Sequence, residues 1–299
     1  MIGVNRNQVF WRLLMDPIVF LHRVIDRIGQ LPVVRHGRAR LWERRFAAHA
    51  KGKNVFRGVF SSFDEAARSM PRNKPLGYDN PRSAQIYADR LARILPSDYP
   101  VMFWLNHLFA AGCRTVLDVG GNVGNCYYAY NQYLSTPSSL RWTVNDVPAV
   151  LDVARRIARE KGSSEALLFV DRTEDADPAD IMLINGALQF FPVAAPALNA
   201  SLKGRPKHLI ISRIPLHTAE TYFTLQSIGS AFCPYRIEAE ESFINALARI
   251  GYRVMDRWRV PDLKCEIPFF PRYSVDSYSG FYFERTCVED THLSPSSAP

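Results

Sequence analysis

The segment Val116-Leu117-Asp118-Val119-Gly120-Gly121-Asn122-Val123-Gly124-Asn125 places a short apolar run directly before a glycine-rich turn. The apolar run is typical of a buried strand, and the residues after the turn suit the start of a helix. Glycines allow a sharp turn and the close approach of a ligand, because they carry no Cβ atom. The free N–H groups and the positive dipole at a helix N-terminus attract the negative end of a ligand. The segment therefore predicts a strand–turn–helix unit that binds a ligand.

Two common nucleotide-binding motifs do not fit this turn. A dinucleotide-binding G-x-G-x-x-G fingerprint that begins at Gly120 would need glycines where Asn122 and Asn125 stand. A P-loop is excluded because no G-K-[ST] sequence follows. A NAD-dependent oxidoreductase is therefore a distant alternative.

The chain beyond residue 113 alternates strand and helix patterns. Such alternation predicts an α/β fold with a mostly parallel, seven-stranded sheet. The first strands are continuous apolar runs, as expected for parallel strands that are covered on both faces. The predicted strands are Thr115–Val119, Leu140–Asn145, Ala166–Val170, Ile181–Ile184, His208–Ser212, Tyr252–Trp258 and Gly280–Glu284.

The glycine-rich turn resembles the first motif of class I S-adenosylmethionine (SAM)-dependent methyltransferases. Asp118, Gly120 and Gly124 match that motif, whereas Asn122 replaces its usual middle glycine. Asp146 follows 28 residues after Asp118, at the end of the second predicted strand. The resemblance implies a Rossmann-like class I methyltransferase fold with SAM as cofactor and Asp146 as acceptor for the ribose hydroxyls; the alternative role for Asp146 is to cap the next helix.

The same resemblance implies further residues of the cofactor site. Asp171 ends the third strand, near the adenine amino group, although a surface turn would also suit it. Asn185 and Gly186 would flank the methionine part, and Tyr78 would lie in a lid loop. The cofactor-binding positions so predicted are Tyr78, Asp118, Gly120, Gly121, Asn122, Gly124, Asp146, Asp171, Asn185 and Gly186.

A general base is harder to identify. Plant-type O-methyltransferases often carry a catalytic His directly after the position of Leu188, and here that residue is Gln189. His217, at the carboxyl end of a strand, is the predicted catalytic base, and His107 is predicted to be a core residue. Arg213 is a candidate partner for an acidic acceptor, for Asp180 or for Glu220. No metal site is expected, because the five cysteines are scattered and never form C-x-x-C.

The predicted organisation has four parts. Residues 1–57 form a basic helical extension, 58–112 a helical cap or lid segment, 113–287 the SAM-binding domain, and 288–299 a disordered tail. The first part contains helices over about 14–28 and 38–49. Residues 60–285 as a whole resemble a bacterial family of class I methyltransferases whose acceptors are generally unassigned.

The positive charge belongs to one end of the chain. Residues 1–57 carry a net charge of +9, and the remainder carries −1. This segment predicts docking to an acidic partner or an anionic membrane surface; the alternative is a solvated, arginine-rich helical face. No specific nucleic-acid partner is expected, because aromatic residues do not alternate with the basic ones.

Composition indicates the class of protein and the compartment that suit this chain. A hydrophobic content of 47% is that of a globular chain. The sequence contains no run of about 18 apolar residues, so it predicts no membrane span. Arg12 and Asp16 interrupt any signal-peptide core, and reduced cysteines suit a cytoplasmic protein.

These features predict a SAM-dependent methyltransferase that acts on an O or N atom of a small-molecule or saccharide-type acceptor. The first alternative is a non-catalytic binding or scaffold protein with a methyltransferase fold, which the absence of an obvious base would favour. The second is a nucleic-acid methyltransferase, which the basic segment would favour. Against it, residues 185–188 read Asn-Gly-Ala-Leu, not the Asn-Pro-Pro-Tyr type of motif.

Overall fold

The computed structural model describes residues 32–50, 52–80, 82, 85, 88, 91, 93–200 and 203–286. The chain divides into two compact units, Met1–Ala48 and His49–Pro299. The described part of the first unit is helix α2 (Pro32–Ala48), which begins earlier than the predicted residue 38 because Pro32 suits the first turn of a helix. The predicted helix over 14–28 and the predicted tail over 288–299 lie outside the described residues.

The second unit contains a seven-stranded sheet with the order β10-β11-β6-β5-β2-β3-β4. Strand β11 runs antiparallel to both of its neighbours, while β6, β5, β2, β3 and β4 pair in parallel. This is the strand order of the class I methyltransferase fold, so the predicted fold is confirmed. All seven predicted strands are present, as β2 (Thr115–Val119), β3 (Arg141–Asn145), β4 (Leu167–Val170), β5 (Ile181–Asn185), β6 (His208–Ile214), β10 (Tyr252–Val260) and β11 (Tyr278–Arg285).

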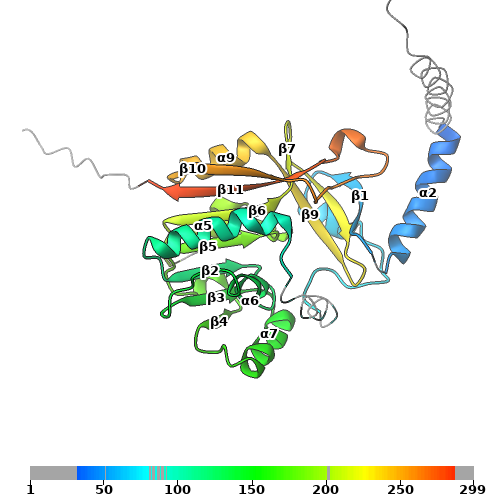
Figure 1. The fold of residues 1–299 in the computed structure, drawn as a ribbon. Helices are drawn as coiled ribbons and strands as arrows, with labels where there is room; N and C mark the ends of the chain where they lie inside the picture. The colour runs from blue at the N-terminus through cyan, green and yellow to red at the C-terminus, as the bar shows by residue number, and fades with distance from the viewer. Residues whose placement is uncertain are drawn as a thin grey trace, which may run out of the picture. The chain divides into compact units, whose positions relative to one another are not determined.

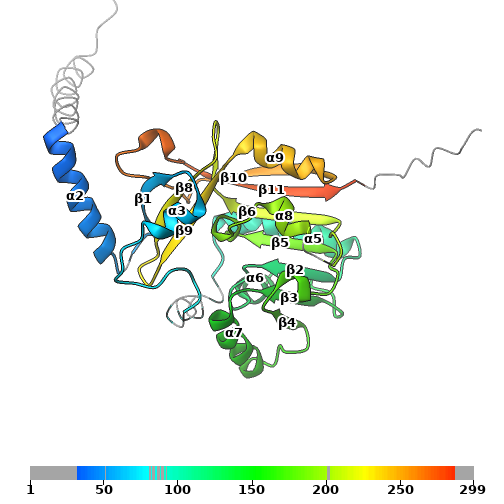
Figure 2. The same cartoon turned by 180° about the vertical axis from the view of Figure 1, so that it is seen from behind.

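Helices cover both faces of this sheet (Figures 1 and 2). Alternate residues of each strand point to opposite faces, so Val116 packs with one apolar cluster and Leu117 with the other. The first cluster includes residues of α5 (Tyr99–Ala110), α6 (Asn125–Tyr130) and α7 (Pro148–Glu160), and the second includes residues of α8 (Ala195–Ala200) and α9 (Glu240–Arg249). The large sheet is thus the middle layer of three. None of the described helices combines the length and the hydropathy of a membrane span.

A second sheet, which the sequence analysis missed, lies beside the large one. Its order is β1-β8-β9-β7, with bounds β1 (Val55–Phe60), β8 (Tyr222–Ser227), β9 (Phe232–Ala239) and β7 (Leu216–His217). Pro234 within β9 disguised that strand, because proline is rare inside sheets. The predicted domain boundary after residue 57 falls inside β1, so residues 55–57 belong to this sheet and not to a helical extension. The segment 58–112 is likewise only partly helical, with α3 (Phe63–Arg68) and α5 as its described α-helices.

Candidate active site

A cavity of about 700 Å³ opens at the carboxyl ends of the parallel strands. Open α/β sheets bind their ligands at this edge, and the volume is within the roughly 300–1,000 Å³ of small-molecule sites. Residues of the small sheet, of α3 and of the segment between α3 and α5 complete its wall. The lining residues include nine of the ten predicted cofactor-binding positions, namely Tyr78, Asp118, Gly120, Gly121, Asn122, Asp146, Asp171, Asn185 and Gly186.

The tenth position, Gly124, does not line the cavity but shapes the turn that does. It has φ +87° and precedes α6, and a Cβ atom there would lie 3.1 Å from the Leu167 side chain. Gly120 has φ +68°, and its Cβ would lie 2.2 Å from that of Ala187. Asn122, in place of the usual glycine, has φ +60°, a conformation that asparagine tolerates better than most residues. The turn of the motif is therefore preserved despite the substitution.

Asp118, at the end of β2, is an almost fully buried carboxyl group. It is 1% exposed, and its Oδ2 atom accepts a hydrogen bond from Trp142 Nε1 at 3.1 Å. Its Oδ1 atom has no hydrogen-bond partner among the described residues. Burial raises the pKa of Asp118 to about 7, the Trp142 hydrogen bond opposes this shift, and the charge of Asp146 adds to it.

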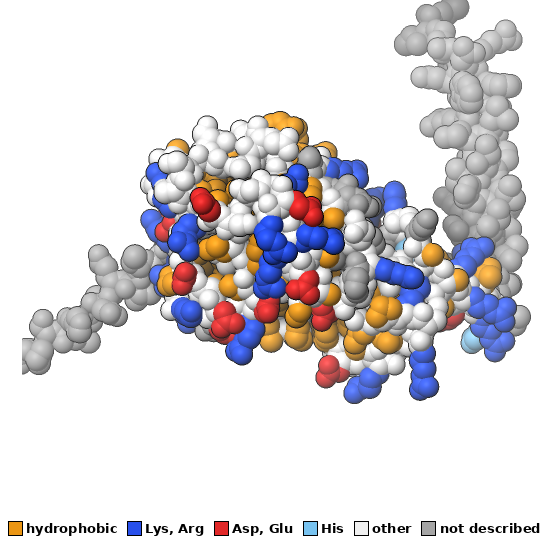
Figure 3. All heavy atoms as spheres, turned by 90° about the horizontal axis from the view of Figure 1, so that it is seen from below, with side chains coloured by type: hydrophobic (Ala, Val, Ile, Leu, Met, Phe, Trp, Pro, Cys, Tyr) orange, Lys and Arg blue, Asp and Glu red, His pale blue; other side chains and the backbone are white. Residues whose placement is uncertain are grey.

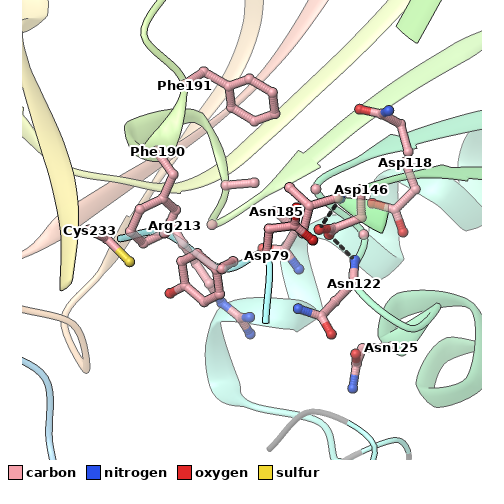
Figure 4. A pocket seen from close by; sticks show the side chains of 18 of the residues that line it. Asp79, Asp118, Asn122, Asn125, Asp146, Asn185, Phe190, Phe191, Arg213 and Cys233 are labelled. Atoms are coloured by element: carbon pink, nitrogen blue, oxygen red, sulfur yellow. Dashed lines mark hydrogen bonds between the residues drawn. The ribbon is translucent and has the colours of Figure 1, made fainter. Parts of the chain in front are cut away.

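Asp146, which follows β3, faces the glycine-rich turn (Figure 4). Its carboxylate accepts hydrogen bonds from the backbone N–H of Asn122 and of Val147, both at 2.8 Å. Burial raises the pKa of Asp146 to about 6, these two hydrogen bonds oppose the shift, and the charge of Asp79 adds to it. A carboxylate has about four acceptor sites, so capacity remains for hydroxyl groups of a ligand.

Asn185, at the end of β5, belongs to a buried polar network. Asp98 Oδ1 accepts hydrogen bonds from Tyr130 Oη at 2.6 Å, Arg213 Nη2 at 2.7 Å and Asn185 Nδ2 at 3.1 Å. The network fixes the amide of Asn185 with its nitrogen toward Asp98. The opposite amide atom, Asn185 Oδ1, is buried and has no donor among the described residues.

Arg213 is held rigidly at the end of β6. It has φ +57°, which is unusual for a residue other than glycine, and its Nε atom donates to Ser97 Oγ at 2.9 Å. Its ion-pair partner is Asp98, not Asp180 or Glu220. The sequence analysis missed Asp98, because this residue is 115 positions from Arg213 and no local pattern links the two.

The opposite end of the cavity is apolar. Figure 4 shows Phe190, Phe191 and Cys233 on the side away from Asp118 and Asp146. Phe190 ends the short helix η3 (Leu188–Phe190), and its ring packs edge-to-face with Tyr78 at 4.9 Å between centroids. The remaining apolar lining residues of the whole cavity are Phe63, Leu76, Leu95, Cys126, Ala187, Pro192 and Pro234, with Val147 and Pro148 at the start of α7.

The loop that carries Tyr78 is tied down on both sides. Gly77 N–H donates to Phe232 O at 2.8 Å, and Phe232 N–H donates to Pro75 O at 3.0 Å. On the other side, Asp79 Oδ1 accepts from Ala149 N–H at 2.9 Å, in the first turn of α7. The loop therefore bridges the small sheet and α7 along the cavity wall, which fits the predicted position of Tyr78.

The structure does not support His217 as the catalytic base. His217 does not line the cavity; its Nε2 atom lies 3.0 Å from Arg272 O, and its Nδ1 atom accepts from the backbone N–H of Ala219 and Glu220. Both ring nitrogens are thus engaged by the backbone. The prediction of a core position for His107 is wrong, because its side chain is exposed on α5.

Two further predicted positions have local partners. Gln189, at the place of the plant-type histidine, donates from Nε2 to Gly186 O at 2.8 Å and does not line the cavity. Asp171 does line the cavity, but it also forms an ion pair with Arg155 at 2.9 Å and is half exposed. Gln189 therefore stabilises the turn after β5, and Asp171 lies at the rim of the site.

No family model and no curated protein matches the sequence. One similar solved structure is that of the 1,6-didemethyltoxoflavin-N1-methyltransferase of Burkholderia thailandensis, with S-adenosylhomocysteine bound. It is 20% identical to this chain, the match covers 69% of this chain and 83% of the other, and the TM-score is 0.44. An O-methyltransferase family protein from the same organism is 15% identical over 86% of this chain and 72% of its own, with a TM-score of 0.46.

A third solved structure, the magnesium protoporphyrin IX methyltransferase of Synechocystis PCC 6803 with bound S-adenosylhomocysteine, is 12% identical. That match covers 70% of this chain and 97% of the other, with a TM-score of 0.46. Likenesses with TM-scores below 0.5 do not by themselves assign a fold. The strand order of the large sheet, with antiparallel β11 between β10 and β6, gives this protein the class I methyltransferase fold.

Proposed function

We propose that this protein is a SAM-dependent methyltransferase that transfers a methyl group to an O or N atom of a small molecule. The observation that carries the proposal is a pair of buried oxygen atoms without donors, Asp118 Oδ1 and Asn185 Oδ1, on residues that line one cavity. A buried acceptor without a partner costs about 1–3 kcal/mol. A ligand with an ammonium group would satisfy both atoms, and the methionine part of SAM carries such a group.

The neighbouring residues suit the rest of that ligand. Asp146 retains acceptor capacity for two ribose hydroxyls, and Asp171 lies farther along the rim, where the adenine ring would extend. The left-handed turn at Gly120 and Asn122 brings the backbone to the cavity, and at Gly120 no side chain intervenes. These are the same residue types, at the same strand ends, that the resemblance of the sequence implies.

The chemistry needs alignment more than it needs acid–base groups. The bound sulfonium supplies an activated methyl group, so the protein mainly has to orient the acceptor and exclude water. The Asp98–Arg213–Asn185 network provides a rigid floor between the polar and apolar ends of the cavity. The loop around Tyr78 covers the same space, and its two anchors hold it in place.

We propose a separate role, in docking, for the basic segment over residues 1–57. Arg38, Arg40, Arg44 and Arg45 of α2 are all exposed. Such a group of cations would dock to an acidic partner or an anionic membrane surface, and it takes no part in the cavity.

The test is a calorimetric titration of the purified protein with S-adenosylhomocysteine, the product form of the cofactor. We expect saturable binding that Asp146→Asn weakens about tenfold or more, because a hydrogen bond to a charged group contributes about 1.5–3 kcal/mol. Asp152→Asn is the matched control, since Asp152 is an exposed carboxylate on α7 outside the cavity. Absence of binding by folded wild-type protein would refute the proposal, as would equal losses in the two variants.

A further inference from the structure

The cavity has two ends of different chemistry, and the proposed cofactor accounts for only one of them. The carboxylates of Asp118 and Asp146 and the amides of Asn122, Asn125 and Asn185 belong to the cofactor end. The other end, which we call the acceptor end, is lined by Phe63, Leu76, Tyr78, Phe190, Phe191, Pro192, Cys233 and Pro234. Figure 4 shows this separation for the residues that it labels.

The acceptor end is built to present flat apolar surface. Phe190 is fixed between two aromatic rings, with Tyr78 at 4.9 Å and Tyr235 at 5.1 Å, both edge-to-face. The Phe190 side chain is only partly buried and lines the cavity, so part of its surface is available to a further flat molecule. Aromatic pairs contribute about 0.5–1.5 kcal/mol beyond their buried area. Phe63 is fixed in the same way, with Phe223 at 6.4 Å.

Hydrogen-bonding side chains are scarce at this end. Of the eight side chains that define it, only Tyr78 carries a hydroxyl group, and Cys233 is a buried thiol whose pKa burial raises to about 12. A saccharide would bring many hydroxyl groups into this space, and each one that stayed unpaired would cost about 1–3 kcal/mol. The lining therefore disfavours a sugar and favours an apolar ring system.

The titratable side chains that line the cavity indicate which kind of acceptor group could attack the methyl carbon. No histidine, lysine or glutamate is among the described residues that line the cavity. Of its four aspartates, Asp118 and Asp146 lie at the cofactor end (Figure 4). The other two are exposed and each has one oxygen engaged: Asp79 Oδ1 accepts from Ala149 N–H, and Asp171 Oδ1 pairs with Arg155.

An aliphatic alcohol has a pKa near that of water, about 15.7, and depends on a base. A phenol, with a pKa of about 10, loses its proton far more readily. Arg213, whose guanidinium is held by Asp98 and Ser97, lines the cavity beside Asn185. Its ion pair with Asp98 neutralises its charge, but its remaining N–H groups can donate to a nearby oxygen, and a donor favours the ionised form of that oxygen.

We propose that the acceptor is a flat aromatic molecule that presents a phenol-type hydroxyl group, and not a saccharide. This inference rests on the proposed methyltransferase function. The phenol oxygen forms a bond to the methyl carbon while the carbon–sulfur bond breaks and leaves its electron pair on sulfur. The phenol proton goes to bulk water, so the products are the aryl methyl ether, S-adenosylhomocysteine and a proton.

The experiment uses the full chain in two stages, so that the two proposals can fail separately. S-adenosylhomocysteine is titrated first, and its absence of binding would refute the proposed function and this inference with it. The protein saturated with S-adenosylhomocysteine is then titrated with 2-naphthol and, in parallel, with methyl glucoside. Naphthol binding that is at least about tenfold tighter than glucoside binding supports the inference; binding of glucoside with equal or higher affinity, or no naphthol binding, overturns it.

Variants locate the probe at the acceptor end. Phe190→Ala should weaken naphthol binding at least about tenfold, which corresponds to about 1.4 kcal/mol, because the substitution removes an aromatic contact surface. Leu76→Asn is a second variant at a half-exposed side chain, which limits the risk of misfolding. Phe270→Ala is the matched control, because Phe270 is partly exposed and does not line the cavity. Unchanged naphthol affinity in both acceptor-end variants, with S-adenosylhomocysteine binding intact, would also overturn the inference.

Discussion

At the residue scale, the buried carboxyl group of Asp118 is costly to the protein in the absence of a ligand. Only one of its oxygens is hydrogen-bonded, and its neighbour Asp146 carries the same charge. Gly121 stands beside this carboxyl group because a Cβ atom there would lie 2.5 Å from Asp118 Cγ. Functional groups are often kept at a cost to stability, and the cost of Asp118 should be measurable as a dependence of stability on pH.

The expected sign follows from proton binding. The pKa of Asp118 is about 7 in the folded protein and 3.8 ordinarily, so between these values the folded state binds more protons than the unfolded state. The free energy of unfolding should therefore fall as the pH rises from about 4 to about 7. Asp146, with a pKa raised to about 6, contributes in the same direction.

Asp118→Asn removes this dependence at one site while it keeps the shape of the side chain. We expect the melting temperature at pH 8 to be several degrees higher in the variant. Each unit of the pKa shift corresponds to about 1.4 kcal/mol in the free energy of unfolding, and each kcal/mol changes the melting temperature by about 2–4 °C. At pH 5 the two proteins should differ much less. A variant that is less stable than the wild type at pH 8 would contradict this account.

At the scale of elements, the glycine-rich turn joins β2 to α6 by three left-handed residues, Gly120, Asn122 and Gly124. The sequence predicted this turn because its glycines are a local signal that needs no tertiary information. It also predicted the seven strands of the large sheet, of which β2 and β5 are continuous apolar runs and β10 alternates between buried and more exposed residues. It missed β8 and β9, because their burial depends on aromatic partners such as Phe56 and Tyr278, which are far away in the sequence.

The turn gives a matched pair of glycine substitutions. Gly120→Ala and Gly162→Ala impose the same left-handed strain, since the φ angles are +68° and +65°. Only the first creates a clash, with the Ala187 Cβ at 2.2 Å, whereas nothing lies within 4 Å of the second. We expect Gly162→Ala to cost about 1–2 kcal/mol and to leave binding of S-adenosylhomocysteine intact.

Gly120→Ala should cost clearly more stability and abolish that binding, because Gly120 lies between β2 and the turn after β5. Chemical denaturation measures the stability of both variants, and calorimetry measures their binding. Equal effects of the two substitutions would show that backbone strain alone matters at this turn.

At the scale of the whole molecule, the site and the core belong to the same unit. All four apolar clusters, from Phe56 to Phe283, and every lining residue of the cavity lie within His49–Pro299. The net charge is also unevenly distributed along the chain, with +9 on residues 1–57 and −1 on the remainder. Basic and acidic side chains are interspersed over the face shown in Figure 3, and on α7 Arg155 pairs with both Asp152 and Asp171.

A fragment of residues 49–299 tests this division. We expect it to unfold cooperatively and to bind S-adenosylhomocysteine within about threefold of the full chain, because it keeps the core and the cavity. Circular dichroism during heating and calorimetric titration are the measurements. A fragment that fails to unfold cooperatively, or that has lost binding, would show that residues 1–48 are part of the site or of its support.

The sequence by itself determined the large sheet, the glycine-rich turn and the acidic residues at the strand ends, because these features depend on local patterns of apolar residues and glycines. The tertiary structure alone decided the acceptor end, the partner of Arg213 and the position of His217. Asp98 and Arg213 meet only because α5 begins, and β6 ends, at the same edge of the sheet. Phe190 meets Tyr78 only because β9 ties a distant loop over the cavity. Contacts between segments that are far apart in the chain leave no local signal, and it is such contacts that shape the cavity.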